Sequence, residues 1–398
     1  MGNLNLPEGW STTTLGSFMD FKNGVNADKD AYGKGVKFVN VMDIFRKNYL
    51  LSDDITGSVE ITDKQLDRYS VVRGDILFNR TSETRNEVAF SSVYLGEEKI
   101  TFGGFVIRGR QTKQLLLPEY AKYCFKTNRI RKEIIRRSQG VVRANIGQKD
   151  LSKVPIVIPP YDDQKLIVSI LDEWGQMIEK TEALIDAKER QFGWLVTKLI
   201  NKSNHKKRQI SSFIEEVSKR NRGSKINLVL SVTNHNGFVL PEDQFERRVA
   251  SADVTNYKVV KQGQYAYNPS RINIGSIARL DDWDYGIISP MYAVFKLDHD
   301  KVNSDYFLQW LSSNEAKQRI KKSAQGSVRE TVSFDDLGNI PIHLPDLSVQ
   351  KNIANTLNTV KQEINLLKKL TDQYRIQKCG LMQKLLSGKW HIRNKEAV

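Results

Sequence analysis

Two stretches of the chain place apolar residues at alternating spacings of three and four over many turns. The first stretch runs from Ile167 to Leu199 and the second from Ile353 to Leu385, and only Thr and Lys residues interrupt them. This heptad spacing predicts two long helices that begin near Asp163 and Val349. Each would be about 55 Å long. Because one chain carries two seams, we expect the helices to pair with each other. The alternative is that each seam lies on its own domain.

Ahead of each long helix, short segments rich in β-branched and aromatic residues stand between turn residues, which is typical of strands. The predicted strands are 37–44, 75–80, 87–95 and 101–108 in the first half, and 226–232, 264–268 and 287–297 in the second. A helix is predicted at 118–138, with Pro118 in its first turn, and another at 304–323, with Ser304 as its N-cap. Proline-punctuated strands at 154–160 and 340–345 end the two units.

The two halves also repeat one another in sequence. Residues 139–200 align without a gap onto 325–386, each residue with the one 186 positions later. A period this long indicates duplicated domains rather than a solenoid of short repeats. The segments that precede the two copies are only loosely alike. The sequence therefore predicts a repeated framework that supports two divergent domains with different surfaces.

Charge narrows the class of partner. The formal net charge is +15, with 61 Lys and Arg, so we expect long-range attraction to polyanions, although a solvated basic surface has the same composition. Cys124 and Cys379 stand too far apart to form a metal-ligand pair. Two cysteines allow no disulfide framework beyond one bridge, which fits a reducing cytosol. The N-terminus lacks the features of a signal peptide, and no apolar run is long enough to span a bilayer. We expect a soluble cytoplasmic protein without membrane association.

Motifs for catalysis are weak. The sequence Asn268-Pro269-Ser270-Arg271 lacks the second proline and the aromatic residue of the clamp around a flipped adenine. No glycine-rich cofactor loop follows a strand, and Gly388-Lys389 lacks the upstream glycine of a Walker A loop. Asp75 with Glu97-Glu98-Lys99 could hold Mg²⁺ as in a nuclease, but a charged turn between Leu95 and Ile100 explains the tripeptide better. The five histidines give no pair at metal-ligand spacing.

The order of the repeated phrases resembles the specificity (S) subunit of type I restriction–modification enzymes. Leu6-Pro7-Glu8-Gly9-Trp10, followed by Leu15-Gly16, resembles the opening phrase of that family. The run from Gln139-Gly140 to Gln164-Lys165 resembles its junction between a target-recognition domain and a long helix. The second copy runs from Gln325-Gly326 to Gln350-Lys351, and it departs from the first in having Pro345-Asp346 in place of a double proline. The resemblance covers nearly the whole chain.

The resemblance implies a mixed α/β fold class, with two α/β target-recognition domains joined by two long antiparallel coiled-coil helices in a pseudo-two-fold duplication. The implied parts are domain 1 at 1–160, a central long helix at 161–203, domain 2 at 204–346, a C-terminal long helix at 347–388 and a tail at 389–398. The implied function is recognition of a bipartite, asymmetric DNA site. The implied partners are double-stranded DNA, two methyltransferase subunits that methylate adenine, and two restriction subunits that cleave with ATP.

No cofactor is expected on this chain. S-adenosylmethionine, ATP and Mg²⁺ are expected on the partner subunits, in a bacterial or archaeal cytoplasm. Two competing hypotheses stay open at this point. One is a self-contained methyltransferase or nuclease with duplicated recognition domains, and the other is a scaffold whose basic surface binds an acidic protein.

Candidates for reading bases are polar and cationic residues on loops where the two repeats diverge, because Arg, Asn, Gln and Lys form the specific contacts in the grooves. In the first domain these are Arg80, Ser82, Thr84, Arg85 and Asn86, with Lys34 and Arg46 as further candidates. In the second domain they are Asn268, Ser270, Arg271 and Asn273, with Arg222, Lys225, Asn234 and His235. Ordinary surface loops use the same residue types.

Candidates for contacts with the phosphate backbone are cations on the predicted helices and residues of the repeated loops. The helical candidates are Lys126, Arg129, Lys132 and Arg136 in the first half, and Lys321 and Lys322 in the second. The loop candidates are Gln139, Arg143, Gln325 and Arg329, since a reader of bases would not be duplicated unchanged. A solvated helix face, or helix capping and domain closure, explains the same residues without DNA.

Overall fold

The two long helices are present as predicted and contribute to both halves of the structure. The computed structural model describes residues 6–140, 143–200, 205–234, 236–244, 253–324 and 331–390. Helix α6 is Tyr161–Ile200 and helix α11 is Leu347–Leu386. Two units form by contact, the first from Met1–Thr181 with Leu370–Val398 and the second from Glu182–Lys369. Within the described residues, no helix is long and apolar enough to cross a bilayer.

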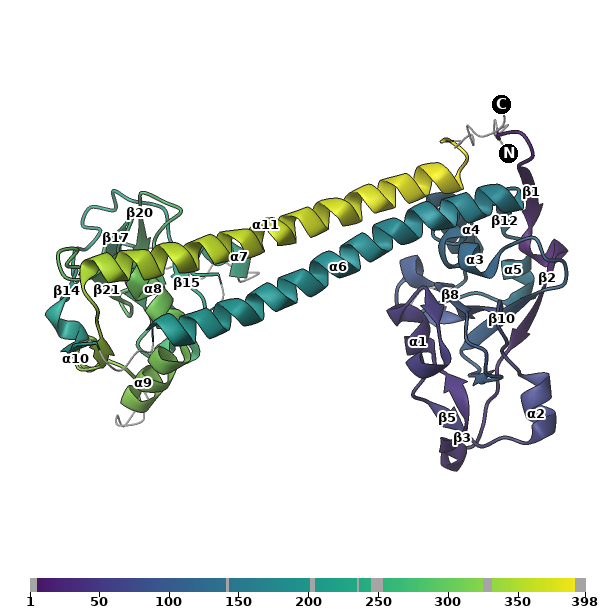
Figure 1. The fold of residues 1–398 in the computed structure, drawn as a ribbon, viewed down its shortest axis with the longest axis horizontal. Helices are drawn as coiled ribbons and strands as arrows, with labels where there is room; N and C mark the ends of the chain where they lie inside the picture. The colour runs from purple at the N-terminus through teal and green to yellow at the C-terminus, as the bar shows by residue number, and fades with distance from the viewer. Residues whose placement is uncertain are drawn as a thin grey trace. The chain divides into compact units, whose positions relative to one another are not determined.

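Within each unit, the two long helices lie side by side and antiparallel (Figure 1). In the first unit, the ring of Trp174 on α6 packs edge-on against the ring of Tyr374 on α11, with 5.9 Å between centroids. In the second unit, Lys188 pairs with Glu363 at 2.8 Å and Glu189 pairs with Lys368 at 2.6 Å. The seam residues are buried where the helices meet their domain, as at Leu171 and Leu357. The predicted pairing of the seams is confirmed.

The first unit is built on a mixed five-stranded sheet in the order β2-β10-β6-β8-β4. Neighbours in this sheet are antiparallel, except for the parallel pair β4 and β8. A three-stranded sheet, β5-β3-β9, and the pairs β1-β12 and β7-β11 complete the strands described here. The strands are β1 Ser11–Thr14, β2 Met19–Asn23, β3 Tyr32–Val39, β4 Tyr49–Leu50, β5 Ser58–Val59, β6 Ile76–Asn79, β7 Thr81–Ser82, β8 Ser91–Tyr94, β9 Thr101–Phe102, β10 Val106–Gln111, β11 Ala144–Asn145 and β12 Pro155–Ile158.

Short helices pack against this sheet and against the ends of α6 and α11. They are α1 Val41–Arg46, α2 Asp63–Arg68, α3 Pro118–Cys124, α4 Asn128–Arg137 and α5 Gln148–Ser152. In the main core, the ring of Phe78 on β6 packs edge-on against the ring of Phe125 at 5.1 Å. Leu171 of α6 and Leu385 of α11 belong to the same core. Burying each such side chain stabilises the fold by about 1.5–3 kcal/mol, so the sheet and the helix ends form one hydrophobic unit.

The second unit repeats this plan with a four-stranded sheet in the order β14-β21-β18-β19. The pairs β13-β22, β15-β16 and β17-β20 stand beside it in the described residues. The strands are β13 Lys207–Gln209, β14 Ile214–Glu216, β15 Ser231–Val232, β16 Phe238–Val239, β17 Lys258–Lys261, β18 Tyr265–Tyr267, β19 Ile277–Arg279, β20 Tyr285–Ile288, β21 Ala293–Leu297 and β22 Pro341–His343. The helices are α7 Pro241–Gln244, α8 Ser304–Ser312, α9 Asn314–Ala324 and α10 Phe334–Gly338. At its centre the ring of Tyr265 stacks on the ring of Phe295 and packs edge-on against the ring of Phe307.

Both helices predicted ahead of the repeats are broken in two. The segment 118–138 forms α3 and α4, because the Thr127 hydroxyl accepts the backbone N–H of Ile130 and starts a new helix. The segment 304–323 forms α8 and α9, and the Ser313 hydroxyl accepts the backbone N–H of Ala316 in the same way. The predicted strand 37–44 was also wrong at its end. Asn40 begins helix α1 with a capping box that uses Asp43.

The repeated glutamines fasten the start of each long helix to its own domain. The Gln164 side chain is buried, donates to the carbonyls of Leu115 (2.8 Å) and Pro159 (2.9 Å), and accepts from the backbone N–H of Leu117. Gln350 does the same in the second unit with Lys301, Pro345 and Asn303. Leu117 and Asn303 are the N-caps of α3 and α8. In each unit one amide therefore bonds to three backbone groups and ties the start of the long helix to the segment that begins α3 or α8.

Candidate nucleic-acid interface

The structure brings the candidate loop of the first domain against the repeated loop. Strand β7, which follows Arg80, pairs antiparallel with β11, with Ala144 opposite Ser82. The backbone N–H of Ile146 donates to the carbonyl of Arg80 at 3.1 Å. Gln139 and Asn145 exchange a pair of backbone hydrogen bonds at 2.8 Å, which closes the turn that leads to Arg143. Residues predicted separately for base reading and for backbone contact thus form one surface.

Within that loop, the five candidates separate into two groups. Ser82 is buried, and its hydroxyl donates to the carboxylate of Glu87 at 3.2 Å. Thr84 donates to the same carboxylate at 2.7 Å, so both hydroxyls are used inside the loop. Arg80, Arg85 and Asn86 are exposed, and their side chains make no hydrogen bond within the described part of the chain. The first group shapes the loop and the second is presented to solvent.

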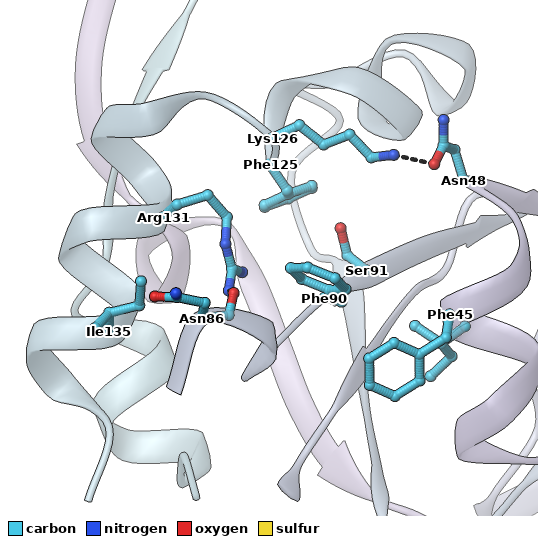
Figure 2. Close-up of a pocket in the computed structure, with 10 residues that line it drawn as sticks. Phe45, Asn48, Asn86, Phe90, Ser91, Phe125, Lys126, Arg131 and Ile135 are labelled. Carbon is cyan, nitrogen blue, oxygen red and sulfur yellow. Dashed lines mark hydrogen bonds between the residues drawn. The ribbon is translucent and has the colours of Figure 1, made fainter. Parts of the chain in front are cut away.

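Arg131 of α4 holds the far end of this loop. Its guanidinium donates to the carbonyls of Asn86 (2.9 Å), Val88 (2.6 Å) and Ala89 (3.0 Å). It also lies over the ring of Phe90, 4.8 Å from the centroid. Figure 2 shows Arg131 beside Asn86 and Phe90. Burial lowers the pKa of this guanidinium to about 10. The sequence places Arg131 among the basic residues of the predicted helix 118–138, which could contact phosphates, but it does not show that the Arg131 donors meet carbonyls some 40 residues away.

The four cations predicted on the first helix differ in exposure. Lys132 is exposed, and Arg136 is exposed while paired with Glu133 at 3.0 Å. Lys126 turns inward to donate to the Asn48 side chain, and burial together with the charge of Lys378 lowers its pKa to about 8. Arg129 is half-buried. Because the helix breaks at Thr127, Lys126 is separated from the other three, which follow one another on α4 at spacings of three and four and so share a face. Of these three, Lys132 and Arg136 are exposed.

The second domain repeats the arrangement of the two loops. The N–H of Val332 donates to the carbonyl of Pro269 at 3.0 Å, the counterpart of the bond from Ile146 to Arg80. Asn268 is buried, and its side-chain oxygen accepts the N–H of Ser270, which caps the turn. Ser270 and Arg271 are exposed, and Asn273 is half-buried in a 3-10 turn. Gln325, Arg329 and His235 lie outside the described residues.

The remaining candidates lie at several places. Asn234 is exposed and its backbone lies against Gly275, at the end of the Arg271 loop. Arg222 and Lys225 are exposed on a separate turn held by buried Asn221. Lys321 and Lys322 are exposed at the end of α9. Lys34 pairs with Glu60 at 2.6 Å, and Arg46 lies 4.0 Å from Asp43.

A second group of cations in the first domain was missed. Lys22 and Arg68 both lie over the ring of Tyr69, at 5.6 and 5.4 Å from its centroid. Burial and the charges of Arg108, Arg68 and Arg110 lower the pKa of Lys22. Within the described residues, neither Lys22 nor Arg68 has a carboxylate at ion-pair distance. The adjacent pair Arg68-Tyr69 is a visible signal, but only the pairing of β2 with β10 brings Lys22 and Arg108 beside each other.

The carboxylate considered for a nuclease site is occupied by an arginine. Asp75 is buried, and Arg110 donates to both of its oxygens, from Nε at 2.8 Å and from Nη2 at 2.6 Å. The N–H of Val72 donates to the same carboxylate. Glu97 pairs with Arg73 instead. Across the described ranges, no three acidic, His or Cys side chains gather as metal ligands would. The structure gives Asp75 a role in holding the sheet.

Comparison with known proteins identifies the family of the chain. The family model described as "Type I restriction modification DNA specificity domain" matches residues 7–189 and 248–373. A protein of Methanocaldococcus jannaschii described as the MjaX type I restriction enzyme specificity subunit is 25% identical, over 98% of this chain and 95% of its own length. The MjaVIII specificity subunit of the same organism is also 25% identical, over 99% and 96%.

A solved structure shares the fold along the whole chain. The HsdS subunit from Thermoanaerobacter tengcongensis superposes with a TM-score of 0.55 and 14% identity, and the match covers 98% of this chain and 99% of that one. Its likeness concerns the fold alone, whereas the family model covers more than half of the sequence. The chain belongs to the type I restriction–modification DNA specificity family, as a non-catalytic specificity subunit.

Proposed function

We propose that this chain recognises a bipartite, asymmetric DNA site, each α/β domain reading one half. The observation that carries the proposal is the matched pair of loops, in which a repeated loop is bonded to a divergent loop in both units, through Ile146 to Arg80 and through Val332 to Pro269. The exposed side chains of the two divergent loops differ, with Arg80, Arg85 and Asn86 in one and Ser270 and Arg271 in the other. Two like-built domains therefore present different groups to base edges.

The cations beside these loops supply the sequence-independent part of the affinity. The exposed cations are Lys132 and Arg136 on α4 in the first domain, and Lys321 and Lys322 at the end of α9 in the second. Neutralising phosphates releases counterions, so binding should weaken steeply with salt. The net charge of +15 acts in the same direction by attracting DNA over long range.

The chemistry is assigned to partner subunits. We propose that two methyltransferase subunits bind the paired long helices and methylate adenine with S-adenosylmethionine, and that two restriction subunits add ATP- and Mg²⁺-dependent cleavage, in the cytoplasm. The support is the family membership, together with two helices that carry the same repeated phrases in both units.

Methylation mapping tests the proposal directly. The chain is co-expressed with its methyltransferase subunit in cells without other adenine methylation, and methylated adenines are mapped over the genome. The expected result is a motif of two unlike half-sites separated by a spacer of fixed length. A palindromic motif would contradict the asymmetry. Methyl transfer by the isolated chain would contradict its non-catalytic role.

A further inference from the structure

A half-open pocket of about 420 Å³ lies in the first domain beside the candidate loop. Phe45 of α1 and Phe90, just before β8, form its apolar wall, with ring centroids 5.7 Å apart and planes inclined at 57°. The polar groups are the amides of Asn48 and Asn86, the Ser91 hydroxyl, and two cations (Figure 2). Its volume and largely apolar lining are those of small-ligand sites, in which a few polar groups fix orientation.

The pocket carries positive charge without a compensating carboxylate. Lys126 and Arg131 line it, no Asp or Glu does, and within the described residues neither cation has a carboxylate at ion-pair distance. Arg131 spends its donors on three carbonyls of the loop. The Lys126 ammonium makes one hydrogen bond, to the Asn48 side chain, and burial and the charge of Lys378 lower its pKa to about 8. A bound anion would remove this electrostatic cost, so the pocket is complementary to an anionic group.

The remaining groups specify what accompanies the anion. Aromatic rings bind the faces of unstacked nucleobases, and amides pair with their edges. Asn86, whose amide lines the pocket, also ends the loop Arg80–Asn86, so the pocket adjoins the surface proposed to contact DNA. We propose that this pocket binds one nucleotide, with its base against Phe45 and Phe90, its edge at Asn86, and its phosphate beside Lys126. Binding of a nucleotide in this pocket does not depend on the proposed function. That DNA supplies the nucleotide does rest on the proposed function.

Two sources can supply a nucleotide, and the test separates them. In the first arm, calorimetry on the full chain in complex with its methyltransferase measures binding of each of the four deoxynucleoside monophosphates, the matching nucleosides, and inorganic phosphate. In the second arm, binding of a duplex that carries one extrahelical nucleotide is compared with binding of the matched duplex. Lys126→Met and Phe90→Ala are the test variants. Lys113→Met, at an exposed lysine between β10 and α3 that does not line the pocket, is the matched control.

The expected result in the first arm is binding of a mononucleotide about tenfold or more tighter than its nucleoside, because a charge-assisted hydrogen bond is added. Lys126→Met should remove that preference, Phe90→Ala should weaken nucleoside and nucleotide alike, and Lys113→Met should change neither. Binding should take up protons near pH 8 and weaken above it, since the anion binds the protonated amine. Tighter binding of the extrahelical duplex, lost in Lys126→Met, identifies DNA as the source. Equal binding of both duplexes, with mononucleotide binding kept, identifies a free nucleotide.

Several results would overturn the proposal. The first is that no mononucleotide binds at millimolar concentration and that the complex does not prefer the extrahelical duplex. Another is a Lys126→Met variant that loses binding of an acidic peptide but keeps its nucleotide and DNA binding unchanged. That result would assign the pocket to a protein partner. Circular dichroism confirms that each variant is folded, and the Phe90 variant keeps the test open if the Lys126 variant unfolds. A complex that binds mononucleotides through Lys126 but no DNA would contradict the proposed function while leaving the nucleotide site in place.

Discussion

Replacing the buried glutamine at the start of α6 should detach one domain from its helix. Gln164 is 1% exposed, and its amide makes three hydrogen bonds, to Leu115, Leu117 and Pro159. Gln164→Leu leaves one N–H and two carbonyls without this partner in a buried place. Each unsatisfied group costs about 1–3 kcal/mol, and water reaches some of them after local relaxation, so we expect a loss of about 3–5 kcal/mol from the first unit.

Urea unfolding and hydrogen exchange measure this loss in separate ways. The free energy of unfolding should fall by the stated amount, and amide protection should drop at 115–118 and 159–165 before it drops elsewhere. Gln350→Leu should give the same pattern in the second unit, around Asn303 and Pro345, because its bonds match those of Gln164. Gln176→Leu is the control, since Gln176 is exposed on the same helix and should change stability by less than about 0.5 kcal/mol. If Gln164→Leu and Gln176→Leu lost equal amounts of unfolding free energy, the role of the Gln164 amide in fastening α6 to its domain would be refuted.

Three further predictions concern recognition, charge and assembly. Arg85→Ala should relax or abolish one half of the methylation motif at a cost of about 1–3 kcal/mol if the side chain contacts a base, and loss of both halves would indicate misfolding. Lys126→Met should raise the free energy of unfolding at pH 7 by at most about 3 kcal/mol, because the folded pKa of about 8 lies below the ordinary 10.5. The advantage should shrink as the pH rises from 8 to 10.5, where the native lysine has lost its proton and the unfolded one keeps it, and denaturant titrations across that range check this sign. Native mass measurement should find two methyltransferase subunits per copy of this chain, and a fully active one-to-one complex would contradict that expectation.

The long helices and the two α/β domains could be predicted because their signals are periodic and repeated. Heptad spacing survives along a helix whatever packs on it, and the repeat places each helix at the same point of its unit. The breaks at Thr127 and Ser313 were missed for a physical reason. A hydroxyl within a helical segment either lies on the surface or caps a new helix, and composition does not distinguish these states. Thr127 and Ser313 stand 186 positions apart, the same offset as in the repeat that follows them, and this was the available signal.

The site was predictable only as a list of exposed polar residues. Arg80, Arg85, Asn86 and Arg271 are exposed as a reader of bases must be, although their contacts stay predictions. Ser82 and Asn268 turned out to be buried, with hydroxyl and amide used inside their loops. The grouping came from pairing between distant segments. Strand β7 meets β11 more than 60 residues further along, and Arg131 reaches carbonyls some 40 residues back. Local patterns carry no information on such pairs.

The bonds between the repeated and divergent loops explain how one frame tolerates two unlike surfaces. In the first unit the acceptor is the carbonyl of Arg80, and in the second it is the carbonyl of Pro269. An arginine and a proline differ in charge, size and backbone donor, yet both supply a backbone carbonyl, and the donor N–H of Ile146 or Val332 comes from the repeated segment. The frame thus holds each loop through main-chain atoms that every residue possesses. Side chains on the loop are then free to diverge without loss of the join, as specificity for two different half-sites requires.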